Sequence, residues 1–114
     1  MFFIGKESTL EAAEKAGEHC DTFYAYPSED SCIWIGWSSD LDEALEPADV
    51  RITLLMTICN ELKIEDGPNG TVHQLPDSAI RTVLNSITGM GPMWWALKGR
   101  KYLRQAAKKA RGFA

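Results

Sequence analysis

The chain has 114 residues, of which 45% are hydrophobic and 25% are charged. These values are typical of one globular domain, here residues 1–114, and they exclude a disordered or fibrous chain. The sequence has no run of about 20 apolar residues that could span a bilayer, and its first four residues lack the length and basic flank of a signal peptide. We therefore expect a cytoplasmic protein without a membrane partner.

The first 26 residues predict a strand, a helix and a second strand. Phe2 to Ile4 is apolar and short, as in a strand. Ser8 and Glu11 have the spacing of a capping box, which predicts a helix over residues 9–19. Thr22 to Tyr26 is rich in aromatic residues and indicates the next strand.

A third strand is predicted from Cys32 to Trp37, joined to the second by the turn-type residues 27–31 in an antiparallel hairpin. Trp34 and Trp37 are separated by an odd number of positions, so they should lie on opposite faces of the sheet. Tyr24 and Tyr26 should share one face. Either an aromatic cluster faces outward, or helices cover both faces.

Two helices are predicted between residues 38 and 62. Ser38, Ser39 or Asp40 can cap a short acidic helix that reaches Leu45. The segment Val50 to Leu62 fits a helix with one apolar face, and it also fits an alternating strand. We favour the helix because the segment is too long for an ordinary strand and because Asp49 occupies an N-cap position.

The remaining sequence predicts a loop, a strand and two helices. Residues 65–70 combine Gly-Pro and Asn-Gly turn signals, and Thr71 to Leu75 can form a strand. Asp77 or Ser78 can open one helix, and Pro92 can start the last, which runs to about Ala110. The fold class is therefore α+β: an antiparallel sheet of three or four strands packed by three to five helices, ending in a basic amphipathic C-terminal helix.

No set of residues forms a complete catalytic or metal-binding motif. The three cysteines are an odd number, so we expect free thiols that serve as small core residues. His19 and Cys20 are adjacent, yet adjacent helical residues point about 100° apart, and acidic neighbours would raise the thiol pKa. In the sequence, no other His or Cys lies at a metal-ligand spacing from His73. We expect no metal, no cofactor and no enzymatic activity, and an enzyme around His19, Cys20 and His73 is the weakest alternative.

Charge is divided between the two parts of the chain. Residues 1–66 contain fifteen acidic and four basic residues, a net charge of −11, whereas residues 67–114 contain one acidic and eight basic residues, a net charge of +7. The basic residues near the C-terminus fall on one face of the predicted last helix. With Trp94 as a stacking group, they form a candidate nucleic-acid-binding site: Lys98, Arg100, Lys101, Arg104, Lys108, Lys109 and Arg111. The same face could instead be solvated and pair with the acidic helices, or could contact an anionic membrane, which the alanine-rich apolar face disfavours.

The densest acidic run predicts a partner-binding surface: Asp40, Asp42, Glu43, Glu46 and Asp49. Acids at helix N-termini also serve as an ordinary solubilising surface. In size and charge the chain is similar to small phage-encoded inhibitors of host defence, which present carboxylates where a nucleic-acid-binding protein accepts phosphates. That resemblance implies a non-enzymatic regulator that binds a protein partner, and the basic helix as a nucleic-acid-binding site is the alternative function.

Overall fold

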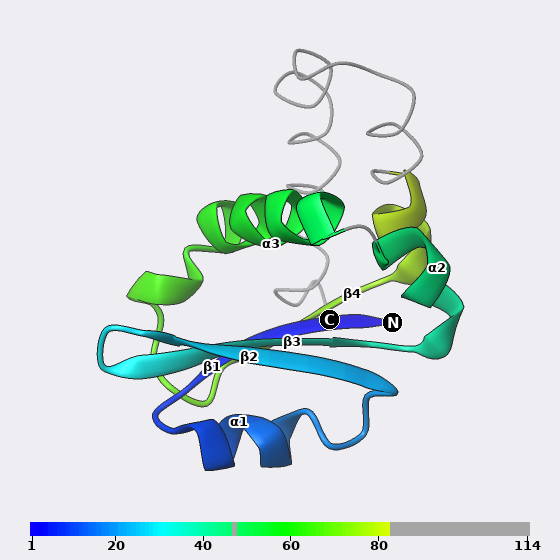
Figure 1. Cartoon of the computed structure of the whole chain (residues 1–114). Helices are drawn as coiled ribbons and strands as arrows, with labels where there is room; N and C mark the ends of the chain where they lie inside the picture. The colour runs from blue at the N-terminus through cyan, green and yellow to red at the C-terminus, as the bar shows by residue number, and fades with distance from the viewer. Residues whose placement is uncertain (47, 83–114) are drawn as a thin grey trace.

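The computed structural model describes residues 1–46 and 48–82, without the side chains of residues 48–50 and 53. Four strands form one antiparallel sheet in the order β2-β3-β1-β4. Their bounds are Phe2–Glu7 (β1), Thr22–Ser28 (β2), Ser31–Trp37 (β3) and Val72–Leu75 (β4). Helices α1 (Leu10–Ala16) and α3 (Ala48–Leu62) lie on opposite faces of this sheet (Figure 1). The predicted α+β fold with a small antiparallel sheet is confirmed.

The hairpin of β2 and β3 is tighter than its sequence indicates. The register continues from Thr22 opposite Trp37 to Ser28 opposite Ser31, which leaves a turn of Glu29 and Asp30. Glu29 adopts a left-handed φ of 52°, as tight hairpin turns require. Pro27, expected in the turn, instead lies within β2. Because β2 is an edge strand, a residue without an N–H is tolerated there.

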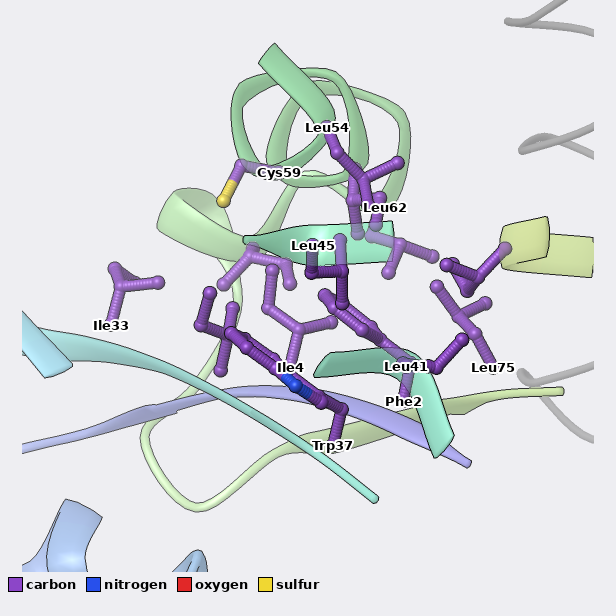
Figure 2. Close-up of a cluster of buried hydrophobic side chains, with 14 residues drawn as sticks. Phe2, Ile4, Ile33, Trp37, Leu41, Leu45, Leu54, Cys59, Leu62 and Leu75 are labelled. Atoms are coloured by element: carbon purple, nitrogen blue, oxygen red, sulfur yellow. The ribbon is translucent and has the colours of Figure 1, made fainter. Parts of the chain in front are cut away.

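The larger hydrophobic core lies between the sheet and α3 (Figure 2). Phe2, Ile4 and Trp37 contribute from the strands, and Leu54 and Ile58 contribute from α3. The core is closed by α2 (Asp42–Leu45) through Leu45, and by the short 3₁₀ turns Ser39–Leu41 and Ile64–Asp66 through Leu41 and Ile64. The short acidic helix expected before residue 46 is thus confirmed.

Exposure along α3 decides between the two interpretations of this segment. Ile52, Leu54, Met56 and Ile58 would all face the same side of a strand. Their exposed fractions are 57%, 1%, 61% and 1%, so burial recurs every four residues and not every two. The helix is confirmed, and it starts two residues before the predicted Val50.

A second, smaller cluster lies between the sheet and α1. It contains Ala13, Cys32 and Trp34. The predicted capping box of Ser8 and Glu11 is wrong, because β1 extends through Glu7 and the N-cap moves to Thr9, whose hydroxyl accepts a hydrogen bond from the Ala12 N–H at 3.1 Å. Trp34 and Trp37 lie in different clusters, so helices cover both faces of the sheet.

Three expectations concern the part of the chain after residue 70. The strand predicted from Thr71 to Leu75 is confirmed as β4, which starts one residue later at Val72, and residues 77–82 begin the next helix, as expected from Asp77. The helix predicted from Pro92 to about Ala110 lies outside the described residues. Within the described part of the chain, no helix is long and apolar enough to cross a membrane.

Candidate interaction surface

Asp42 joins α2 to the sheet. Its Oδ1 atom accepts hydrogen bonds from the Trp37 indole at 2.7 Å and from the Thr22 hydroxyl at 2.8 Å. Both donors come from neighbouring strands, at the position where Thr22 pairs with Trp37. The carboxylate of this predicted partner-binding residue is therefore engaged within the protein.

Glu43 and Glu46, also on or next to α2, are exposed. Together with Asp42 they line a depression of about 510 Å³ whose other walls come from β2, β3 and α3. Asp40 is exposed on the 3₁₀ turn before α2 but does not line the depression, and its carbonyl accepts a hydrogen bond from Arg81. The side chain of Asp49 is not among those described. The structure thus brings three of the five predicted acids to one depression.

Tyr24 and Arg51 form the opposite wall of this depression. The Arg51 guanidinium donates a hydrogen bond to the Tyr24 hydroxyl at 2.9 Å, and its Cζ atom lies 5.1 Å from the Tyr24 ring centroid. The Tyr24 ring in turn stacks on Trp37, with centroids 5.7 Å apart. The stacked rings and the guanidinium hold Tyr24 in place although it is 48% exposed.

Sequence reasoning missed Arg51, although one signal was present. Arg51 is the only Lys or Arg in the sequence between Lys15 and Lys63. A lone cation within an acidic stretch can be recognised from sequence, but its aromatic partner is 27 residues away in the chain. Only the packing of α3 against β2 brings the two together.

An apolar groove of about 230 Å³ continues from this depression. Its lining residues are Tyr24 and Ile35 from the sheet with Arg51, Ile52 and Leu55 from α3. We call this groove and the adjoining depression, with Tyr24, Asp42, Glu43, Glu46, Arg51, Ile52 and Leu55, the candidate interaction surface. It places exposed apolar and aromatic groups beside carboxylates, along the open edge of β2.

The residues considered for catalysis do not meet. His19 packs edge-on against Phe3 with centroids 4.6 Å apart, on the α1 side of the sheet. His73 pairs with Ile4, whose side chain lies in the core on the opposite face. Burial, followed by the charge of Asp21, raises the pKa of the Cys20 thiol, which disfavours the reactive thiolate. Among the described residues, no three His, Cys, Asp or Glu side chains gather as a metal site would require.

The three cysteines are free thiols, with Cys32 and Cys59 buried and Cys20 partly buried. This agrees with their predicted role as small core residues. The Cys59 sulfur lies 3.7 Å from the Tyr26 hydroxyl in a hydrogen bond that either atom could donate.

The basic C-terminal site falls outside the described residues: Trp94, Lys98, Arg100, Lys101, Arg104, Lys108, Lys109 and Arg111. Nucleic-acid binding by this segment stays a prediction from sequence. Comparisons of the chain with protein-family models, curated proteins and solved structures found no match.

Proposed function

We propose that this protein is a small non-enzymatic interaction protein that binds a macromolecular partner, most simply another protein, through the candidate interaction surface. The observation that supports this most is the position of Glu43 and Glu46 in a depression that also contains the exposed ring of Tyr24. Protein interfaces commonly combine an aromatic or apolar centre with a polar rim.

The two glutamates are suited to meet cations of a partner. Neither side chain takes part in a hydrogen bond or ion pair within the part of the chain that the structure describes. Asp42, by contrast, is occupied by Trp37 and Thr22. We therefore assign partner contact to Glu43 and Glu46, and we assign to Asp42 the role of holding α2 in position.

We further propose that the target is a host protein whose own site binds nucleic-acid phosphates. Such a site presents Lys or Arg side chains, which carboxylates can engage in place of phosphates. A phage- or mobile-element-encoded inhibitor of a defence protein would act in this way. The proposal is supported by the small size of the chain and by the net charge of −11 over residues 1–66, which contain fifteen acidic and four basic residues.

The test compares three tagged baits in host lysate: the unmodified full-length chain, the double variant Glu43→Lys/Glu46→Lys, and the control Glu11→Lys/Glu14→Lys. The control reverses the same number of exposed charges on α1, across the sheet. We expect a protein captured by the unmodified chain and by the control to be lost with the Glu43/Glu46 variant. Circular dichroism checks that all three are folded. Equal capture by the unmodified chain and the Glu43/Glu46 variant contradicts the proposal.

A further inference from the structure

The hydrogen-bonding direction of each strand follows from β1, which lies between β3 and β4. The Lys6 N–H donates to Thr71 at 3.2 Å, and the Lys6 carbonyl accepts from the Gly70 N–H at 2.7 Å. Because backbone groups of successive residues point to opposite sides of a strand, the even-numbered residues of β1 bond toward β4 and the odd-numbered ones toward β3. Gly5 and its partner Trp34 therefore form a hydrogen-bonded pair.

The same alternation fixes the open edge of β2. Since Trp34 bonds toward β1, Ile35 bonds toward β2, where its partner is Tyr24. The backbone groups of Phe23 and Ala25 must then point away from the sheet. Neither residue has another backbone hydrogen-bond partner within the described part of the chain. Pro27 is two residues after Ala25, so its backbone nitrogen also points away from the sheet, and the N–H that proline lacks is not needed for a bond to β3.

A strand added along this edge would send alternate side chains toward α3. Opposite Tyr24, such a side chain would enter the apolar groove lined by Ile35, Ile52 and Leu55. Two residues away, about 6.6 Å along the strand, a side chain opposite Thr22 would enter the depression that holds Glu43 and Glu46. The edge, the apolar groove and the carboxylates thus match the spacing of one extended chain.

We propose that the edge of β2 binds an extended segment of a partner protein by antiparallel strand addition. The segment carries an apolar residue opposite Tyr24 and a Lys or Arg two positions later, opposite Thr22. This order follows because an antiparallel strand runs from the Tyr26 end of β2 toward its Thr22 end. Backbone hydrogen bonds supply affinity in strand addition, and the pockets for alternate side chains supply selectivity. The inference rests on the proposed function, since it uses the same two glutamates.

The first test uses the ¹⁵N-labelled full-length chain and two synthetic peptides of equal composition, acetyl-TTVTKTT-amide and acetyl-TTKTVTT-amide. In the free protein, we expect the amides of Phe23 and Ala25 to exchange with solvent faster than those of Tyr24 and Tyr26. Millimolar TTVTKTT should slow the two outward amides about tenfold or more, and the reversed peptide should slow them less. Absence of any slowing, or equal slowing by both peptides, overturns the proposal.

Two modifications separate strand addition from simple charge attraction. Ala25→Pro removes one N–H that points away from the sheet, and it leaves the hydrogen bonds between β2 and β3 in place. Pro27 shows that β2 accepts a proline at such a position. The variant should not bind the peptide. N-methylation of the threonine between Val and Lys in the peptide should do the same without altering the protein. Unchanged binding after N-methylation overturns strand addition even if the Ala25→Pro variant does not fold.

The lysate experiment distinguishes this inference from the function on which it rests. If Ala25→Pro retains a captured partner that Glu43→Lys/Glu46→Lys loses, partner binding through Glu43 and Glu46 is supported and strand addition is wrong. If Ala25→Pro loses the partner and the charge reversal retains it, the partner binds along the edge of β2, and both the proposed function and the pairing of a partner Lys or Arg with Glu43 and Glu46 are wrong. Slowing of the Phe23 and Ala25 amides that rises with protein concentration, without peptide, assigns the edge to a second copy of the chain and overturns the proposal.

Discussion

Asp42 shows how one carboxylate can serve the fold while its neighbours on α2 remain exposed. Sequence alone places Asp42, Glu43 and Glu46 in one acidic run and cannot rank them. Their difference arises from partners that are distant in the chain, because Thr22 lies 20 residues before Asp42. The site was therefore predictable as a charged segment, but the roles of its individual residues were not.

Replacing Asp42 should destabilise the fold. In Asp42→Ala the indole N–H of the buried Trp37 loses its hydrogen-bond acceptor. We expect this to lower the free energy of unfolding by about 1–3 kcal/mol. Asp42→Asn keeps an oxygen acceptor and should recover most of this loss. Urea unfolding measures the effect, with Glu43→Ala as the matched control on the same helix. Equal stability of Asp42→Ala and the control would contradict the assigned role.

Cys20 should be a slow nucleophile. Its pKa is raised chiefly by burial and next by Asp21, so little thiolate forms near neutral pH. At pH 7.5 we expect iodoacetamide to modify Cys20 more slowly than it modifies free cysteine, yet faster than the buried Cys32 and Cys59. Mass spectrometry of the labelled peptides over time gives all three rates. A Cys20 rate above that of free cysteine would revive the catalytic interpretation.

At the scale of elements, residue pattern predicted the type of most segments better than their boundaries. The helical period in α3 was readable because Leu54, Ile58 and Leu62 recur every four residues. The prediction placed Pro27 in the hairpin turn because proline is a turn signal in its local sequence. A strand tolerates proline where the missing N–H would point away from the sheet, and this depends on whether the strand lies at the edge. The sequence does not specify which strand is at the edge, so strand order had to come from the structure.

The pairing of β1 with β3 requires a glycine at position 5. A Cβ atom there would lie 2.5 Å from the Trp34 Nε1 atom and 2.7 Å from its Cε2 atom, and that ring is fully buried. We expect Gly5→Ala to lower the free energy of unfolding by about 1–3 kcal/mol through overpacking. Gly67→Ala is the control, since its Cβ would make only ordinary contacts, the nearest at 3.4 Å. Thermal unfolding of both variants tests the difference, and equal melting temperatures would contradict it.

At the scale of the whole molecule, the free energy of unfolding should fall as the pH rises above the pKa that cysteine thiols have in the unfolded chain. Burial is the main cause that raises the pKa of Cys20, Cys32, Cys59 and the Tyr26 hydroxyl. A group whose pKa is higher in the folded state keeps its proton where the unfolded chain has lost it. Its contribution is therefore complete below the unfolded pKa, about 8.5 for thiols, and is lost as pH rises from there.

This dependence can be measured by urea unfolding between pH 7 and 10 under reducing conditions. We expect the free energy of unfolding to decline above about pH 8.5. Cys59→Ala should decline less steeply, because it removes one buried thiol that contacts Tyr26. The slope is the readout, so a uniform loss of stability in the variant does not affect the test. Parallel slopes in the two proteins would contradict the assignment to Cys59.

The positions of Trp34 and Trp37 on β3 also make the chain its own reporter of folding cooperativity. One indole lies in the cluster under α1 and the other in the core under α3, although only two residues separate them. In chains with Trp94 and Trp95 replaced by phenylalanine, removing either remaining tryptophan would leave a single fluorophore that senses one layer. Coincident transitions from the two would indicate that both layers melt as one unit, and separated transitions would identify the layer that opens first.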